Sequence, residues 1–326
     1  MHSIHRLKAT LCGALLAIAS LVATPSAHAQ DYPNRPVKLV VAQAAGGAAD
    51  VLGRVLATRL SDALGQQVIV DNKAGANGII GVEAVAKAPP DGYTLLLGSA
   101  PNLAINPALY RKLSYDPMTD LAPIAILGQV YYAVLVPANS PANTMSEFIA
   151  MVRAKPNQFN YGSGSSGARA NIEIFNTAAK IQINHVPYKS NSQALVDTVG
   201  GRLDMIFETT TTAAPQFKTG KVKVLAITSP ERHFLHPEIP AVAEAVPGYE
   251  YSSWVSVNAP AGIPPAVQQR LTNEIGKIMA RPDVIEQFRA LGFEPKYGNA
   301  SVLATRLAND ITRYKKAVKD ANIPLE

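Results

Sequence analysis

Cysteine is almost absent: Cys12 is the single one among 326 residues. It lies ahead of most of the apolar run from Leu11 to Val22, so it is not placed like a lipid-modified residue directly after a signal segment. A chain with no other thiol cannot form a disulfide framework, a thiolate metal site or a cysteine nucleophile. This composition is typical of proteins in an oxidising compartment, where a free thiol is a liability.

Long hydrophobic runs are also missing. The N-terminal run is interrupted by Ser20 and is shorter than the roughly 20 residues that a membrane-spanning helix needs. Arg6 and Lys8 precede this run and Ala27-His28-Ala29 follows it, which is the pattern of a secretory signal peptide cleaved after Ala29. We therefore expect residues 1–29 to be removed and the remaining chain to be exported to the periplasm.

No strong charge of one sign is concentrated anywhere in the chain. The formal net charge is +6, and the basic residues are scattered along the sequence. The absence of a basic patch interleaved with aromatic residues argues against a nucleic-acid partner. A mild positive balance is compatible with an anionic solute, and equally with a solvated basic surface that has no function.

Motifs of known catalytic sites are missing as well. There is no GxSxG turn and no HExxH motif. His185 belongs to an apolar segment and His233 and His236 to a loop, so each is better explained as structural or solvated. Asp50, near an expected helix start, is explained first as a capping or first-turn carboxylate. We expect no catalytic residue, no metal site and no cofactor.

What the sequence does contain is a repeated order of strand, short polar loop and helix. In the N-terminal part, a β-type run at 37–42 leads through the small-residue loop 44–49 into a helical pattern. Further strands are expected at 68–70 and 93–97. Strands that alternate with helices across short loops predict an α/β fold with parallel-rich sheets flanked by helices.

A second block of this kind begins near Tyr132, and the chain is long enough for about two domains. After it come a strand at 254–257 and three helical patterns near the C-terminus. We expect these to pack back on the first block. The predicted organisation is a signal peptide at 1–29, a discontinuous first lobe at 30–131 and 254–326, and a second lobe at 132–253.

Two loops that follow strands are candidate anion sites. The loop 44–49 matches neither GxGxxG nor GxxxxGK[ST], but it offers unhindered backbone N–H groups at a helix N-terminus. The alternative is a tight turn selected only for packing. The loop 162–167 has the same position in the second block. Arg169 follows it and either holds a carboxylate bidentately or forms an i,i+4 surface pair with Glu173, and the sequence leaves both open.

Several short segments follow one another in a fixed order behind the expected signal peptide. They are Tyr32-Pro33-Asn34-Arg35-Pro36-Val37, Ala45-Gly46-Gly47-Ala48-Ala49-Asp50, Val70-Asp71-Asn72-Lys73-Ala74-Gly75-Ala76, Pro90-Asp91-Gly92-Tyr93-Thr94-Leu95-Leu96, Val186-Pro187-Tyr188-Lys189, Gly220-Lys221 with Leu225-Ala226, and Trp254 before Ala259-Pro260-Ala261-Gly262-Ile263-Pro264. Each segment is weak alone, but together they cover essentially the whole mature chain. In this order they resemble the Bug family of binding components of tripartite tricarboxylate transporters.

The resemblance implies a two-lobed periplasmic binding protein-like fold with the ligand in the cleft between the lobes. Three positions depart from the family pattern. Ala49 stands where the family usually has a hydroxyl residue or glycine, Arg169 where it often has histidine, and Ser190 where it often has glycine. These departures leave room for a different second end on the solute. The implied ligand-binding residues are Gln43, Ala44, Gly47, Ala48, Ala49, Asp50, Ser99, Asn102, Ser163, Ser165, Ser166, Arg169, Tyr188, Ser190, Glu208 and Thr209.

The predicted function is a monomeric, hinge-closing periplasmic receptor that binds a small carboxylate and passes it to membrane transporter subunits. A dicarboxylate or tricarboxylate, an aromatic carboxylate and an acidic amino acid are all compatible solutes. Two alternatives remain: a sensor module with the same fold and cleft that presents the solute to a membrane kinase, and a periplasmic hydrolase or isomerase of a small acid. The last requires a nucleophile paired with a base, which the sequence does not display.

Overall fold

The computed structural model describes residues 32–320 and 323–325. The predicted signal peptide at 1–29 lies outside the described residues. The contacts group residues 1–34 into one unit and residues 35–326 into a second. Of the first unit only Tyr32–Asn34 is described, and the Tyr32–Pro33 peptide bond is cis.

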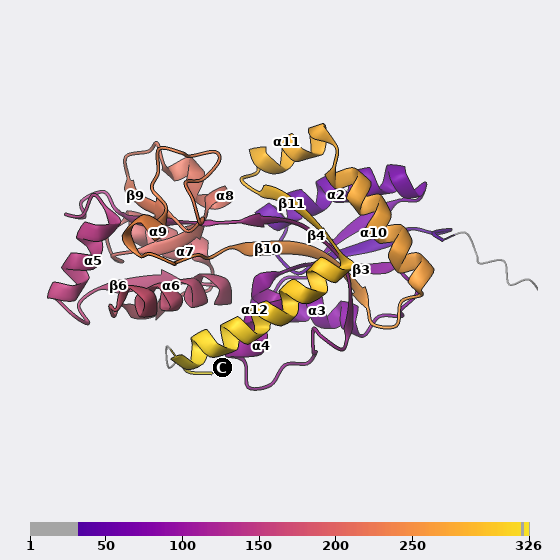
Figure 1. Cartoon of the computed structure of the whole chain (residues 1–326), viewed down its shortest axis with the longest axis horizontal. Helices are drawn as coiled ribbons and strands as arrows, with labels where there is room; N and C mark the ends of the chain where they lie inside the picture. Colours follow the sequence, from indigo (N-terminus) through magenta and orange to yellow (C-terminus); the bar gives the residue numbers. More distant parts are fainter. Residues whose placement is uncertain (1–31, 321–322, 326) are drawn as a thin grey trace, which may run out of the picture. The chain divides into compact units, whose positions relative to one another are not determined.

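The described part of the second unit contains all of the helices and strands named here (Figure 1). Its strands are β1 (Val37–Val41), β2 (Val68–Asn72), β3 (Thr94–Ser99), β4 (Leu121–Val130), β5 (Tyr132–Pro137), β6 (Asn160–Ser163), β7 (Asn184–Pro187), β8 (Ile206–Thr209), β9 (Val222–Ile227), β10 (Ser253–Pro260) and β11 (Glu294–Asn299). Its longer helices are α2 (Ala48–Leu64), α3 (Ile79–Ala86), α5 (Met145–Ala154), α6 (Ser166–Ala179), α7 (Asn191–Val199), α10 (Pro265–Met279), α11 (Pro282–Ala290) and α12 (Ala300–Asp320). Its short helical turns are η1 (Ala76–Gly78), η2 (Pro101–Ile105), α4 (Asn106–Leu109), α8 (Thr210–Ala213), η3 (Ala214–Gln216) and α9 (Val242–Ala245).

A six-stranded sheet joins strands from the two ends of the chain in the order β11-β4-β10-β3-β1-β2. β1 pairs in parallel with β2 and β3, whereas β10 lies antiparallel between β3 and β4. All eight residues of β10 are buried, as expected for a strand that has a neighbour on each side in the sheet. The pairing of β10 with β3 and β4 agrees with the expected packing of the C-terminal segment on the first block, whereas β11, which pairs with β4, was not expected as a strand.

Two smaller sheets contain the remaining strands: β8-β5-β9, which is antiparallel, and β6-β7, which is parallel. The α/β class is thus confirmed, but the expected dominance of parallel pairs is not. β4, β5 and β10 pair antiparallel because the chain passes between the sheets through them and not through helical crossovers. The division into lobes at residues 131/132 and 253/254 stays a prediction.

Local sequence signals account for the helix ends. α2 ends at Gly65, which adopts the left-handed conformation with φ 68° and donates its N–H to the Ser61 carbonyl. The N-caps of α5, α6 and α7 are Thr144, Ser165 and Ser190, and each side chain accepts the N–H of the residue three positions later. The polar loops therefore fix where these helices begin.

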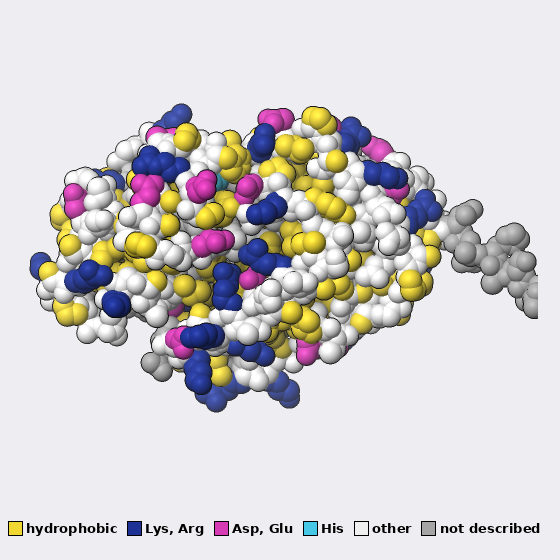
Figure 2. All heavy atoms as spheres, viewed as in Figure 1, with side chains coloured by type: hydrophobic (Ala, Val, Ile, Leu, Met, Phe, Trp, Pro, Cys, Tyr) yellow, Lys and Arg dark blue, Asp and Glu magenta, His cyan; other side chains and the backbone are white. Residues whose placement is uncertain are grey.

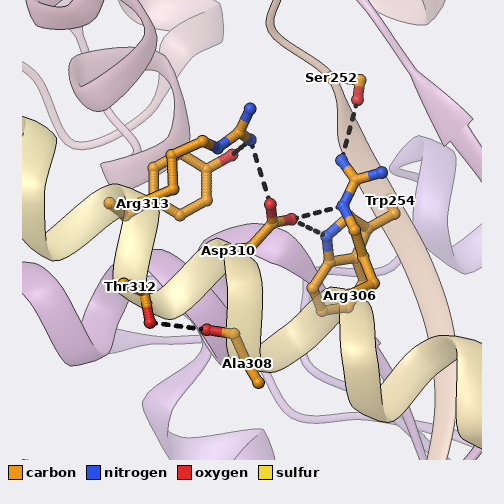
Figure 3. A network of polar contacts seen from close by, with 8 residues as sticks. Ser252, Trp254, Arg306, Ala308, Asp310, Thr312 and Arg313 are labelled. Atoms are coloured by element: carbon orange, nitrogen blue, oxygen red, sulfur yellow. Dashed lines mark hydrogen bonds and ion pairs between the residues drawn. The ribbon is translucent and has the colours of Figure 1, made fainter.

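Helix α12 is anchored by a buried carboxylate, shown in Figure 3. Asp310 accepts hydrogen bonds from Trp254 Nε1 at 2.7 Å and from Arg306 Nε at 2.7 Å, and its other oxygen lies 3.3 Å from Arg313 Nη2. Arg306 also donates to Ser252 Oγ at 3.3 Å. This network joins α12 to the start of β10, and α12 also packs against β4, α4 and α6.

The surface is charged in both signs, as Figure 2 shows for one face, with basic side chains gathered around the C-terminal part of α12. No helix among the described residues is long and apolar enough to cross a membrane. Within the same residues, no three His, Cys, Asp or Glu side chains are grouped as they would be to hold a metal ion.

Candidate functional site

The start of helix α2 presents backbone N–H groups without a side-chain cap. Gly47 is the N-cap, with φ −78° and ψ 167°, and no side chain caps the helix there. Gly46 has φ +80°, a conformation that favours glycine. The first N–H groups of a helix have no acceptor within it, so the amides of the first turn, starting at Ala48, are available to an acceptor from outside.

Asp50, in that first turn, is already engaged. Its carboxylate accepts the Gly46 N–H at 2.9 Å and lies 3.1 Å from the Arg54 guanidinium. Burial raises the pKa of Asp50, but the hydrogen bonds from Gly46 and Arg54 outweigh burial and hold the pKa below its usual value. Asp50 is therefore an ionised first-turn carboxylate that stabilises the loop, in agreement with the explanation based on sequence.

A pocket of about 510 Å³ opens at this helix start. Five segments of the chain close it: the beginning of α2, the beginning of α7, the helical turns α8 and η3, the loop after β9, and the turn between α11 and β11. The lining residues are Gly46, Gly47, Ala48, Val51, Ser192, Thr210, Thr211, Thr212, Ala214, Pro215, His233, Leu235, His236, Ala290, Leu291 and Gly292.

The polar groups of this pocket are mainly neutral donors. The N-terminal ends of α2 and α7 both reach it, and hydroxyls come from Ser192 and from Thr210–Thr212. No lysine or arginine appears among the described residues that line it. Two helix N-termini on one pocket favour an anion by geometry and dipole, without a formal positive charge.

His233 lines the pocket with a neutral ring. Its side chain is 1% exposed, its Nδ1 accepts the Leu235 N–H at 3.2 Å, and its Nε2 has no hydrogen-bond partner in the described part of the chain. Because Nδ1 is an acceptor, the neutral ring carries its proton on Nε2. Burial and the neighbouring His236 lower the pKa of His233 to about 4, so the ring is neutral near pH 7. The two imidazoles stack with centroids 5.6 Å apart.

Of the residues predicted around the first loop, Gly47 and Ala48 line the pocket. Ala49 and Asp50 are buried directly behind them, while Gln43 and Ala44 are exposed in the preceding loop and do not line it.

The predicted residues after β3 and β6 form a separate, packed contact. Asn102 Oδ1 accepts the Ser99 N–H at 2.9 Å, and both residues are buried. Ser166 Oγ donates to Asn106 Oδ1 at 2.9 Å, so the start of α6 is bonded directly to α4. A Cβ atom on Gly167 would lie 2.9 Å from Pro101, which shows how closely the two segments approach.

The other predicted residues near the start of α6 have structural partners. Ser163 Oγ lies 2.7 Å from His185 Nε2, and Ser165 is the N-cap of α6. Arg169 lies half-buried on the same helix and does not line the pocket. Two roles were open for Arg169 from the sequence, and its absence from the pocket lining gives no support to the carboxylate contact there.

Tyr188, Ser190, Glu208 and Thr209 lie beside the pocket without lining it. Tyr188 donates to Asp197 at 2.8 Å, and Ser190 packs so closely on Gly164 that a Cβ there would lie 2.1 Å from the Ser190 carbonyl carbon. Glu208 is buried and accepts the Thr209 N–H at 2.8 Å and its hydroxyl at 3.2 Å. Burial raises the pKa of Glu208 to about 7.

The sequence analysis did not select most of the pocket lining. Thr210–Thr212 directly follow the predicted Thr209, and Ser192 is two positions after the predicted Ser190. His233, His236 and Gly292 are more than twenty residues away in the sequence from any predicted site residue, and no local motif indicates them. Their association with α2 results from chain topology alone.

The fold and this pocket define a two-lobed solute-binding protein. A model of the tripartite tricarboxylate transporter family receptor matches residues 52–323, and the chain belongs to this family. The resemblance to the Bug proteins is confirmed. BugT of Bordetella pertussis is 33% identical over 319 residues, which cover 96% of this chain and 97% of BugT.

Solved structures agree with the assignment. Rpa4515 of R. palustris with adipate is 32% identical, with a TM-score of 0.83 over 90% of this chain and 100% of that one. MatC of Rhodopseudomonas palustris with bound malate is 29% identical, with a TM-score of 0.77 over 88% of this chain and 100% of that one. These family members and neighbours are binding proteins and not enzymes, and so is this chain.

Proposed function

We propose that this protein is a periplasmic receptor that captures a small carboxylate in the pocket at the start of α2 and delivers it to the membrane subunits of a tripartite tricarboxylate transporter. The observation that carries the proposal is the convergence of two helix N-termini and a group of hydroxyls on one pocket. Neutral donors of this kind bind a carboxylate directionally, and a closed cleft strengthens them by excluding water.

The proposal includes the route and the state of the protein. Residues 1–29 direct export and are removed after Ala29, the mature chain acts as a monomer, and the lobes at 30–131 with 254–326 and at 132–253 close on the solute. The neighbours that carry adipate and malate support the carboxylate class. The wider predicted residue set forms, in this proposal, the lining and the support of the closed cleft.

A thermal-denaturation screen against carboxylates tests the binding step. A ligand that binds only the folded protein must raise the melting temperature. At a ligand concentration one hundred times Kd, it adds about 2.7 kcal/mol to the free energy of unfolding. If no carboxylate raises the melting temperature, the proposed solute class is wrong. Deletion of the gene distinguishes delivery from sensing. If the protein delivers the solute, the deletion lowers solute uptake; if it is a sensor, the deletion changes the transcriptional response to the solute.

The role of the α2 amides has its own test in Ala48→Pro. Ala48 is the first residue of α2, where proline is tolerated, and Gly47 before it is already extended. The substitution removes one N–H donor and should weaken carboxylate binding about 10-fold or more, with little change in the unfolding of the free protein. Ala48→Val keeps the N–H and adds similar bulk, and Ala300→Pro places a proline at the first position of α12, outside the pocket. Equal losses in Ala48→Pro and Ala48→Val would show that the amide is not the contact.

A further inference from the structure

A second hollow lies between helix α12 and the loop that joins α4 to β4, and it shares no lining residue with the pocket at the start of α2. Its volume is about 530 Å³. The loop contributes Arg111, Met118 and two aspartates to the lining, and α12 contributes Ile311 and Lys315. Met118 is 48% exposed and Ile311 is half-buried, so apolar and charged side chains share this surface.

The fold gathers here cations that are scattered along the sequence. Arg111 and Lys112 are exposed on the loop. Lys315 and, one turn further, Lys319 are exposed on α12, where Figure 2 shows basic side chains close together. None of these four cations has an ion-pair partner within the described part of the chain.

Nearby carboxylates compensate this charge only in part. Asp320 is already paired with Lys316. Asp116 Oδ1 accepts the Met118 N–H at 2.8 Å, and Asp120 Oδ2 accepts the Asp116 N–H at 2.8 Å. Both aspartates of the hollow are thus engaged by the backbone of their own loop, as side chains that shape a turn commonly are.

The arrangement of the cations suits a surface of many anionic groups better than one small anion. Lys315 and Lys319 are four residues apart on a helix, so their like charges repel each other. These lysines and Arg111 are exposed and do not surround a buried point. Lysine is a strongly hydrated point charge and does not hold a carboxylate bidentately, as arginine does. Clusters of such cations are typical of contacts with anionic lipid headgroups.

We infer that the surface formed by Arg111, Lys112, Met118, Lys315 and Lys319 docks on an anionic phospholipid bilayer. The cations lie over the headgroups, and Met118 enters the boundary between headgroups and acyl chains. The contact is peripheral and reversible, because one cation near such a surface strengthens binding only about five-fold. Lipid binding goes beyond the proposed receptor function and does not depend on it.

Vesicle sedimentation with the mature protein tests this contact. Vesicles of phosphatidylcholine are compared with vesicles of phosphatidylcholine and phosphatidylglycerol at a ratio of about 7:3, in about 50 mM salt. The anionic vesicles should bind the protein at least about 10-fold more strongly. In about 500 mM salt most of this difference should disappear, because the ions screen the charges.

Variants connect the binding to the named cations. Arg111→Gln and Lys315→Gln each remove one charge, so each should weaken binding to the anionic vesicles about five-fold, and the double variant about 25-fold. Lys155→Gln is the matched control, because Lys155 is exposed after α5, lies outside the hollow and removes the same unit of net charge. Unfolding curves of the three variants should match the wild type, since the replaced side chains are exposed.

Met118→Asn separates the apolar contact from the charges. It keeps the N–H that Asp116 accepts and should weaken binding to the anionic vesicles about five-fold, with an unchanged dependence on salt. Unchanged binding would overturn the insertion of Met118 into the bilayer.

Three results overturn the docking on lipid. The first is equal binding to both kinds of vesicle, or to neither. The second is a loss for Lys155→Gln as large as that for Lys315→Gln, because net charge and not this surface would then be responsible. The third is a lower solute uptake by cells with Lys315→Gln although the protein does not bind vesicles, which would assign the surface to an acidic protein partner. The carboxylate screen is independent of all three, so the proposed receptor stands or falls separately.

Discussion

Asp310 and Glu208 are two carboxylates at the same depth, each 4% exposed, in opposite surroundings. Asp310 has an indole N–H and two guanidinium groups around it, as Figure 3 shows. Glu208 accepts hydrogen bonds from the backbone N–H and the hydroxyl of Thr209, and a hydrogen bond from the Asn191 side chain also lowers its pKa. The first joins α12 to β10, and the second lies next to the threonines of the pocket.

The difference shows where this protein places its compensating cations. In the framework that holds α12, the buried carboxylate is paired with two guanidinium groups. Beside the pocket, Glu208 has no ion-pair partner among the described residues, and burial raises its pKa to about 7. A cation there would also attract anions non-selectively, whereas neutral donors select by geometry.

The largest effect is expected from breaking the paired carboxylate. Asp310→Ala leaves the Trp254 N–H buried without an acceptor and leaves Arg306 and Arg313 without their counter-charge. We expect a loss of about 3–5 kcal/mol of unfolding free energy. Urea denaturation followed by circular dichroism measures it, and a loss below about 1 kcal/mol would mean that the network does not anchor α12.

Glu208→Gln tests the unpaired carboxylate through pH. The folded pKa of about 7 lies above the unfolded value of 4.5, so the folded state binds more protons between these values. Stability of the wild type should therefore fall as pH rises from about 4.5 to about 7 and then level off, a cost on the order of 3 kcal/mol.

The neutral glutamine keeps the acceptor for Thr209 and removes this cost. Glu208→Gln should equal the wild type near pH 4 and exceed it in melting temperature at pH 8. Other titrating groups are shared by the two proteins and cancel in the difference. Parallel curves for the two proteins across this range would contradict the raised pKa.

Trp254→Phe tests how much of the Asp310 network depends on the indole. It removes one N–H donor from a carboxylate that keeps both arginines, so we expect a smaller loss, about 2 kcal/mol. Urea denaturation monitored by circular dichroism is the measurement, because Trp254 is the only tryptophan. A loss as large as that of Asp310→Ala would assign the anchoring to packing of the ring.

Glu286→Gln tests a solvent-exposed carboxylate, in contrast to the buried Asp310 and Glu208. Glu286 pairs with Arg289 on α11 at 3.1 Å, but its side chain is 72% exposed. Solvent screens such pairs, so the melting temperature should not change measurably. A clear decrease in low salt that disappears in high salt would show that surface pairs contribute more here than expected.

The strands and helices with strong local patterns were predictable. Val37–Val41 is continuously apolar apart from Lys38, and α2 has helical periodicity ended by Gly65. β11 was not predicted, because its sequence Glu-Pro-Lys-Tyr-Gly-Asn contains proline and glycine and gains its strand conformation from pairing with β4. The pairing direction of the sheets was also not predictable, since β10 reaches its neighbours only after more than a hundred residues of intervening chain.

For the site, the glycine loop before α2 and its available amides were predictable from Gly46 and Gly47. The pocket partners were not. His233 and Gly292 are brought to α2 by the tertiary structure, while Ser166, predicted as a ligand residue, is bonded to Asn106. Sequence spacing gives the faces of single elements, but it does not give which loops meet.

By itself, the sequence determined the α/β class, the helix starts and the family, because these depend on local periodicity, capping residues and short ordered segments. Only the tertiary structure decided which amides, hydroxyls and imidazoles surround one pocket. It also decided that Asp310 lies beside two guanidinium groups, whereas Glu208 has no ion-pair partner within the described part of the chain. The physical reason is that burial and electrostatic compensation depend on distances between atoms far apart in the chain, which no local pattern of residues specifies.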